Sequence, residues 1–369
     1  MNIWLMENKR RIFSLVLWTL IISVVGIVGQ AFYPALVGSK AIQGLETFMN
    51  TPLMNNMMGA FGADIVSLSS YLGFYVTYNS IYTALLGCIF AVLLSSSILA
   101  GEEQGKTADF LLTRPISRGH IYASKALVVL TQIIILSIGV YAAGIIALES
   151  FKEHAPDKIF LTKQRAEHLT EQFYKQPEEF RNFFQLTPEK AIQLTGTDSF
   201  EKQQLNQNPK AYVTLFKQHP RPFIELFLKK DSLNVEQLIK DFSLNKSVTS
   251  GLIGKYSLRK YTIIAIYNFL LMISMATIIY MLAAIFKRGK SVMPTSIAIV
   301  FGAYFLDAIS KITPKSNWFG YISPFKFVNT DVLNPNYGLE VWRVGYFITV
   351  SLLCLCAGYL RYRKKDIIL

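Results

Sequence analysis

The stretch Gly101–Thr107 has glycines, a lysine and a threonine in an order that could bind phosphate. A phosphate-binding loop places four residues between its two glycines and then continues Gly-Lys-Ser/Thr. Only three residues separate Gly101 from Gly105, and Ala100 stands where the first glycine is required. Two adjacent glutamates would also repel phosphate oxygens, and an apolar run precedes the stretch in place of a strand. The sequence therefore predicts no nucleotide site here.

Other residues capable of acid–base or metal chemistry are few and scattered. The chain has 4 histidines, and none lies within an apolar run or beside a nucleophile motif: His120, His154, His168 and His219. No paired-carboxylate or Ser/His/Asp arrangement can be assembled. The 3 cysteines (Cys88, Cys354 and Cys356) lie inside apolar runs and are expected to be small buried hydrophobes. The chain is predicted not to be an enzyme, with no catalytic residue, metal or cofactor of its own.

Asp307 and Lys311 form a possible intramembrane polar site, because they stand one helical turn apart near the end of an apolar run. Ionisable residues inside membrane spans are functional candidates by default. The competing interpretation is a local i,i+4 ion pair whose lysine reaches the surface, and the sequence favours it. Asn268 and Gln132, in the middle of other runs, are expected to join helices by hydrogen bonds.

The elements that carry these residues are apolar runs long enough to cross a bilayer. A span takes roughly 20 apolar residues of helix. Hydrophobic residues make up 52% of the chain and charged residues only 17%, which places it among membrane proteins. Six runs qualify: Ile12–Gln30, Tyr78–Ala100, Ala126–Leu148, Tyr261–Phe286, Val292–Ile309 and Val344–Leu360. The predicted fold class is an all-α membrane protein with six transmembrane helices.

The positions of the basic residues predict the orientation of these spans. The side that holds both termini collects Lys9, Arg10, Arg11, Lys106, Arg114, Arg118, Lys125, Lys287, Arg288, Lys290, Arg361, Arg363, Lys364 and Lys365. The short loops of the other side hold only Lys40, Lys311, Lys315, Lys326 and Arg343. Both termini are therefore expected in the cytoplasm of a multi-pass protein of the cell (plasma) membrane. The net charge of +13 is explained by the flanks of the spans and indicates no nucleic-acid partner.

Two segments on the outer side are long. Phe32–Thr77 is weakly polar and is expected to lie on or dip into the outer membrane face. Glu149–Lys260 is dense in charge, and Thr187-Pro188 and Asn208-Pro209 each place a capping residue before a proline at a helix start. Apolar residues recur there at helical spacing. The predicted organisation is an N-terminal transmembrane part (1–148), a helical extracytoplasmic insertion (149–260) and a C-terminal transmembrane part (261–369).

The cytoplasmic segment Leu99–Lys125, between spans 2 and 3, is unlike a passive turn. Glu102 and Glu103 are expected at the start of a short helix, where acidic groups favour the positive end of the dipole. Pro115 should end that helix, and Ser117 can cap the next one. An apolar stripe with basic ends suits docking into a groove on a soluble partner. It equally suits a helix that rests on lipid headgroups.

This segment resembles the signature of permeases of the type-2 (export-class) ATP-binding cassette transporters. The matching residues are Leu99, Ala100, Gly101, Glu102, Glu103, Gly105, Thr107, Leu111, Leu112, Pro115, Ile116, Ser117, Arg118 and Lys125. Lys106 departs from the pattern, because many relatives have the glycine directly followed by threonine. Weaker matches are Phe61-Gly62, Gly73-Phe74, Tyr321–Phe325 and the basic-Asp-Ile tail Arg363–Ile367. The resemblance covers the six-span frame and leaves out Glu149–Lys260.

The resemblance implies a permease subunit without ATPase activity of its own. In that family two permeases pair, as two copies or as two paralogues, over soluble ATPase subunits that bind ATP and Mg²⁺. The cytoplasmic coupling segment, residues 101–119, would transmit force through Glu102, Glu103, Gly105, Thr107, Leu111, Leu112, Arg114, Pro115, Ser117 and Arg118. Met1–Lys9 would lie along the inner surface, in contact with membrane lipid. The compound exported would be a lipid, a peptide or another amphipathic molecule.

Two other functions remain open on the sequence alone. The insertion 149–260 favours a signalling or mechanical membrane protein, in which ATPase movement reaches the outer domain and no solute crosses. An ion-coupled carrier would show polar groups at mid-span and broken helices in repeated halves, and this sequence has few of either. Transport by sealed vesicles distinguishes the exporter from the signalling protein.

Overall fold

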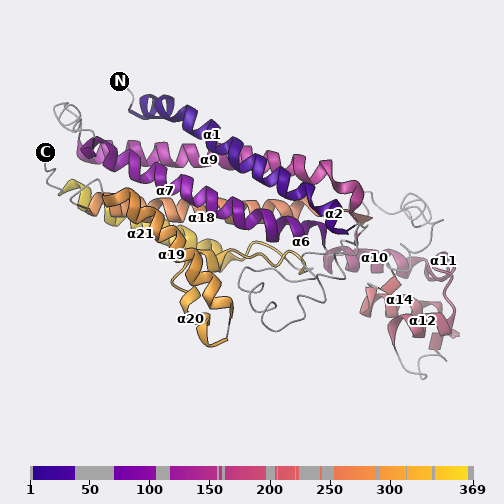
Figure 1. Ribbon diagram of the computed structural model, residues 1–369. Helices are drawn as coiled ribbons and strands as arrows, with labels where there is room; N and C mark the ends of the chain where they lie inside the picture. Colours follow the sequence, from indigo (N-terminus) through magenta and orange to yellow (C-terminus); the bar gives the residue numbers. More distant parts are fainter. Residues whose placement is uncertain are drawn as a thin grey trace. The chain divides into compact units, whose positions relative to one another are not determined.

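The computed structural model (Figure 1) describes residues 3–37, 70–104, 117–155, 158–159, 163–196, 204–205, 207–220, 222–223, 242, 253–286, 291–312, 314–334 and 337–364. The chain divides into two compact units. The first, the membrane unit, comprises Met1–Ala155, Leu258–Leu333 and Tyr337–Leu369. The second, the helical unit, comprises Pro156–Ser257 and Asn334–Asn336.

Six helices of the membrane unit are long and apolar enough to cross a bilayer, which confirms the predicted all-α membrane fold. They are α1 (Ile3–Ala31), α7 (Ile81–Gln104), α9 (Arg118–Ser150), α18 (Leu258–Ile285), α19 (Val292–Ile312) and α21 (Val341–Arg363). Most extend beyond the apolar runs of the sequence, because polar residues at the ends continue the same helical hydrogen bonding.

Helix α18 is the central element of the membrane unit. It packs against α7, α9, α19 and α21, and α1 packs mainly against α9 (Figure 1). Small and hydroxyl side chains let neighbouring backbones approach closely. Ala276, Ala283, Ala284 and Ser274 of α18 are accordingly buried. A helix buried on most sides explains why this run shows no polar face.

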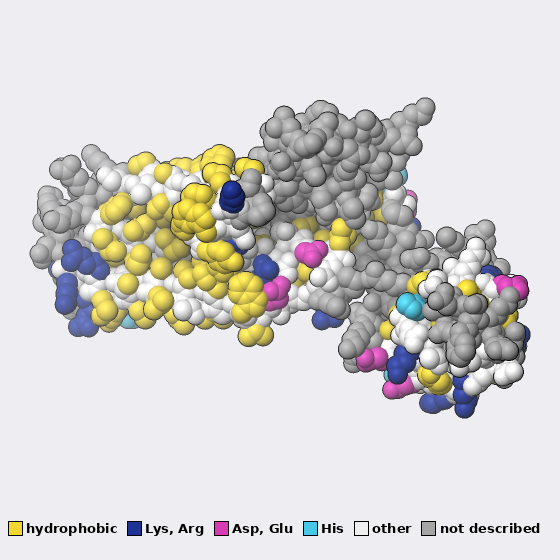
Figure 2. All heavy atoms as spheres, turned by 90° about the horizontal axis from the view of Figure 1, so that it is seen from below, with side chains coloured by type: hydrophobic (Ala, Val, Ile, Leu, Met, Phe, Trp, Pro, Cys, Tyr) yellow, Lys and Arg dark blue, Asp and Glu magenta, His cyan; other side chains and the backbone are white. Residues whose placement is uncertain are grey.

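The outward faces of the other helices are apolar. Phe13 of α1, Ile138 of α9 and Leu353 of α21 are 78%, 63% and 65% exposed. Figure 2 shows hydrophobic side chains spread over the membrane unit and Lys and Arg gathered at its left end. An apolar surface of this extent is unfavourable in water and favourable in lipid. The chain is a multi-pass membrane protein.

A π-helix, η1 (Tyr75–Ser80), leads directly into the N-terminal end of α7 and follows α6 (Tyr71–Phe74). Ser70 caps α6 by accepting a hydrogen bond from the backbone N of Gly73. The Tyr71 hydroxyl donates to the carbonyl of Leu148 at 2.6 Å, so this start is tied to the end of α9. The short helix α2 (Tyr33–Val37) supplies Tyr33, whose ring meets that of Tyr71 edge-on. Most of the predicted outer segment Phe32–Thr77 lies outside the described residues.

Short helical turns join α19 to α21: η4 (Pro314–Ser316), α20 (Asn317–Gly320) and η5 (Pro324–Phe327). Glu340, just before α21, accepts hydrogen bonds from Asn329, Trp342 and Arg343 at 2.6, 2.7 and 2.9 Å. Partial desolvation opposes the charge on Glu340, but the bonds from Arg343 and its neighbours hold the pKa of this carboxyl below its usual range. The final span therefore starts at an ionised, fully hydrogen-bonded carboxylate.

The helical unit contains α10 (Lys163–Lys175), α11 (Pro177–Phe183), α12 (Pro188–Thr195) and α14 (Pro209–Gln218). Thr187 and Asn208 cap α12 and α14 by accepting from the backbone N of Lys190 and Lys210, which confirms both predicted starts. Two-residue strands β1 (Lys158–Ile159) and β2 (Ile253–Gly254) pair antiparallel. These strands, next to either end of the unit, are the only strands among its described residues.

An aromatic core holds the helical unit together. Its buried members are Leu169, Phe173, Phe180, Phe184, Leu186, Ala191, Leu205, Tyr212, Val213, Leu215, Phe216, Phe223 and Phe242. The Phe173 ring lies 4.7 Å from that of Phe180 and 5.1 Å from that of Phe216, centroid to centroid. Burial raises the pKa of the Tyr212 hydroxyl, and the nearby Arg181 partly offsets that rise.

Candidate coupling site

The predicted coupling segment begins inside α7. This helix runs through Glu102 and Glu103 to Gln104, so the two glutamates lie in its last turn. The expectation that they start a separate helix is wrong. The span continues past its apolar part, because Ala100–Gln104 contains no proline and its Glu and Gln residues favour helix enough to accommodate Gly101. The predicted contacts Gly105, Thr107, Leu111, Leu112, Arg114 and Pro115 lie outside the described residues.

The segment ends at Ser117, as the sequence predicts. Ser117 has extended backbone angles (φ −65°, ψ 142°), and its Oγ accepts a hydrogen bond from the backbone N of His120 at 3.3 Å. Arg118 is the first residue of α9. A serine in this geometry satisfies one of the free N–H groups of the first turn. The entry of the coupling segment into span 3 is therefore set by a local cap.

Lys125 joins the two helices on either side of the coupling segment. Its side chain is fully buried, and Nζ donates to the backbone carbonyl of Ile98 in α7 at 3.0 Å. A buried ammonium group is costly unless its protons are accepted by well-placed oxygens. Lys125 therefore fixes the position of the end of α7 relative to the beginning of α9.

The beginning of α1 contacts the same two helices. The Trp4 indole donates to Thr131 Oγ1 at 3.1 Å, and Gln132 Nε2 donates to Asn8 Oδ1 at 2.9 Å. The second bond joins α9 to α1, as expected of a mid-span glutamine. Residues 3–9 belong to the continuous helix α1. The placement of Met1–Lys9 along the inner membrane surface stays a prediction.

An ion pair completes the contact between α1 and α7. Arg11 Nε lies 3.3 Å from Glu7 Oε2, and Arg11 Nη1 donates to Ser97 Oγ at 2.7 Å. Glu7 is buried, so its charge depends on this partner. Sequence reasoning missed both the pair and its contact with Ser97. The i,i+4 spacing of Glu7 and Arg11 was the available signal.

Replacing Lys125 with methionine should lower the free energy of unfolding by about 1.5–3 kcal/mol, the typical worth of a charged hydrogen bond. The apolar chain keeps its packing, whereas the Ile98 carbonyl loses the ammonium donor. Thermal unfolding of the purified protein measures the loss. Lys315→Met, which removes an exposed basic residue of the same unit, is the control. Equal unfolding temperatures in the two variants would show that Lys125 contributes no more than a surface charge.

The second predicted site, Asp307 and Lys311, is brought together in the last turns of α19. Lys311 Nζ lies 2.7 Å from Asp307 Oδ2, and the two side chains are 39% and 6% exposed. This is the geometry of a local pair whose lysine reaches outward. Asp307 Oδ1 is buried and accepts no hydrogen bond from the described residues. The carboxylate is therefore held by a single partly exposed cation.

A small cavity of about 30 Å³ lies between α7, η1, α9 and α18. Asn268 Oδ1 and Ser137 Oγ belong to residues that line it, and neither atom has a hydrogen-bond partner in the described part of the chain. A polar cavity of this size can hold one water molecule. The expected direct helix-to-helix bond through Asn268 Oδ1 is therefore absent among the described residues.

The described residues thus provide two candidate sites. The first is the set of contacts that join α1, α7 and α9 (the coupling frame), and the second is the ion pair in α19. Within the ranges that the structure describes, no cluster of His, Cys, Asp or Glu could hold a metal ion. The frame is built from α1, α7 and α9, which are the first three candidate spans.

Comparison with known protein families bears on this same region. Residues 1–163 match the family described as ABC-2 family transporter protein. The match takes in α1, α7, the whole coupling segment and α9. No curated protein and no solved structure shows significant similarity to the chain. The match confirms the resemblance to type-2 ABC transporter permeases over residues 1–163.

Proposed function

We propose that this chain is the permease subunit of an exporter driven by a separate soluble ATPase. The observation that carries the proposal is the family match, because it includes every residue from Leu99 to Lys125. The proposed cargo is a lipid, a peptide or another amphipathic compound. ATP and Mg²⁺ would bind to the ATPase subunit, and this chain would bind no cofactor. Both termini and the coupling segment would face the cytoplasm at the plasma membrane.

The proposed coupling path runs from the coupling segment through the coupling frame. An ATPase that moves this segment would pull on Ser117 and on the end of α7 together, since Lys125 joins the two helices. Movement would pass to α1 through Ser97 and Thr131. A rigid frame suits this task, because a loose one would absorb the displacement before it reached the spans. A second permease, as a copy or a paralogue, would complete the transport path.

Introducing charged residues into the apolar part of the coupling segment should uncouple ATP hydrolysis from transport. Leu111→Asp with Leu112→Asp should reduce capture of the soluble ATPase at least tenfold, because carboxylates would enter an apolar docking contact. The measurement is co-purification of the permease with the ATPase, followed by ATP hydrolysis in reconstituted vesicles. Ala100→Ser, in the helix that precedes the segment, is the mild control. Undiminished capture by the double variant would rule out docking through these leucines.

A second function deserves a test because the helical unit has a core of its own. In that alternative, ATPase movement is transmitted to an outer partner and no solute crosses. The core motivates it, since a simple conduit needs no separately folded unit. Sealed vesicles that contain the permease and its ATPase distinguish the two. ATP-dependent movement of an amphipathic solute supports the exporter, whereas partner binding without solute movement supports the signalling protein.

A further inference from the structure

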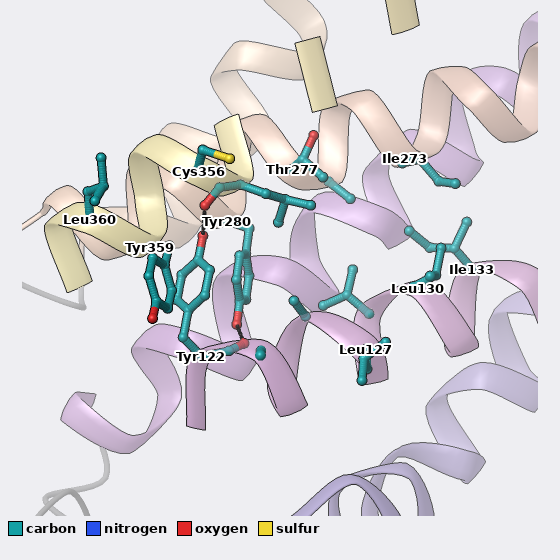
Figure 3. A pocket seen from close by; sticks show the side chains of 15 residues that line it. Tyr122, Leu127, Leu130, Ile133, Ile273, Thr277, Tyr280, Cys356, Tyr359 and Leu360 are labelled. Carbon is teal, nitrogen blue, oxygen red and sulfur yellow. Dashed lines mark hydrogen bonds between the residues drawn. The ribbon is translucent and has the colours of Figure 1, made fainter. Parts of the chain in front are cut away.

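A groove of about 720 Å³ lies between α9, α18 and α21, separate from the coupling frame (Figure 3). Tyr122, Tyr280 and Tyr359 stand at one end of it, and Ile133 and Ile273 stand at the other. Tyrosine favours the membrane–water interface, whereas isoleucine favours the hydrocarbon. The groove therefore has an interfacial end and a hydrocarbon end.

The tyrosine hydroxyls at the interfacial end are used within the protein. Tyr122 Oη donates to the Leu355 carbonyl at 3.2 Å, and Tyr280 Oη donates to the Tyr122 carbonyl at 2.7 Å (Figure 3). These bonds fix the orientation of the two tyrosine rings, and the faces of the rings form part of the apolar wall of the groove. The centroids of the Tyr122 and Tyr359 rings are 5.9 Å apart. The groove is thus a preformed apolar surface, suited to an aliphatic chain.

The groove is open along its side. Leu127 and Leu360, which line it, are 54% and 62% exposed. Cys356 also lines it and is exposed, and Cys354 is half-buried, so the expectation of buried cysteines is correct only for Cys88. Small residues of α9, including Ala123 and Ala126, leave the space that larger side chains would fill. A ligand can therefore enter from the lipid without passing through the protein.

The length of the groove matches one leaflet. Tyr122 and Ile133 are eleven residues apart on α9, which corresponds to about 16 Å at 1.5 Å per residue. The hydrocarbon core of a bilayer is about 30 Å thick, so the groove reaches roughly to its middle. An acyl chain that enters beside the tyrosines would lie along the groove for most of its length.

The interfacial end is basic. Arg118 lies one turn before Tyr122, and the Arg363 guanidinium carbon lies 5.8 Å from the centre of the Tyr359 ring. Arg361 and Lys364 are exposed at the same end of α21. Neither the first turn of α9 nor the last turn of α21 contains an acidic residue. This charge is complementary to a phosphate and selects against a neutral headgroup.

We propose that the groove binds one acyl chain of an anionic phospholipid, with its phosphate held by Arg118 and Arg363. The lipid comes from the leaflet on the basic side of the membrane. It would join α9 to α21, which meet at this end through Tyr122 and Tyr359. The site shares Arg118 with the coupling segment. Binding of a lipid requires neither the ATPase nor the exported compound, so it can be measured separately from the transport function.

Native mass spectrometry of the full chain in detergent tests the site, with dioleoyl phosphatidylglycerol and dioleoyl phosphatidylcholine as probes. Wild-type protein should bind the anionic lipid at least tenfold more tightly than the neutral one. Ala126→Trp should fill the groove and weaken binding of the anionic lipid at least tenfold. Ile138→Trp, on an exposed part of α9 outside the groove, should leave it unchanged. If Ala126→Trp does not fold, Ala123→Trp, at an exposed position, replaces it.

A separate double variant tests the contact between the two arginines and the lipid phosphate. Arg118→Gln with Arg363→Gln should bring phosphatidylglycerol binding down to the level of phosphatidylcholine. Equal affinity of the wild type for both lipids, or equal binding by the Ala126→Trp and Ile138→Trp variants, would overturn the proposal. A disulfide between the Cys356 residues of two copies, formed in a Cys354→Ser background and insensitive to added lipid, would also overturn it. That result would make the groove a contact between permease subunits.

Discussion

Replacing Phe173 with alanine should destabilise the helical unit by about 3–5 kcal/mol, the usual cost of removing a buried phenylalanine. Phe173 is 1% exposed, and its ring contacts those of Phe180, Phe216 and Phe242. The cavity left behind would face several aromatic rings that cannot all move to fill it. Backbone amide hydrogen exchange of α10–α14 in the full chain measures the effect.

The neighbouring Tyr174→Ala is the matched control, since it also removes an aromatic side chain from α10. Tyr174 is 37% exposed, and its hydroxyl bonds to Thr214 at the surface. Its loss should cost about 1 kcal/mol, the net value of an ordinary hydrogen bond. A cost for Phe173→Ala no larger than that of the control would contradict the assignment of Phe173 to the core.

The same variant separates the two proposed functions. An exporter whose path runs through the spans should retain solute movement in vesicles when the helical unit is loosened. A signalling protein that acts through this unit should lose its response to the outer partner. The comparison is informative because the unit has its own core, so loosening it leaves the contacts within the membrane unit unchanged.

Replacing Lys311 with methionine should lower the free energy of unfolding by about 2–3 kcal/mol. Breaking a buried ion pair typically costs about 3–5 kcal/mol, and the exposed lysine head reduces that figure through solvent screening. Asp307 would be left as a buried carboxylate with neither oxygen paired. Thermal unfolding of the purified chain in detergent gives the measurement.

The double variant Asp307→Asn with Lys311→Met decides what the pair is for. Removing both charges should recover most of the lost stability, because no ion remains buried without a partner. If the pair is only structural, vesicles with this variant should also keep ATP-driven transport. Restored stability with transport lost would instead make Asp307 and Lys311 a functional polar site within the span.

Local features of this protein could be predicted from neighbouring residues. The six spans follow from apolar runs, and the starts of α9, α12 and α14 follow from Ser117, Thr187 and Asn208. A helix cap or a membrane span is determined by residues that are close together in the sequence, so it can be recognised from a short stretch of the chain. The coupling motif is equally contiguous, and the family match over residues 1–163 confirms the resemblance that it carries.

Features that join distant residues were decided by the tertiary structure alone. The Trp4–Thr131 bond joins residues 127 positions apart, and the Tyr280–Tyr122 bond joins residues 158 positions apart. In the sequence, Lys125 looks like another basic residue that flanks a span, whereas in the structure it is buried against α7. The groove depends on how α9, α18 and α21 diverge, because each contributes only part of its wall. Shape complementarity among helices, which no single run of residues encodes, determines these contacts.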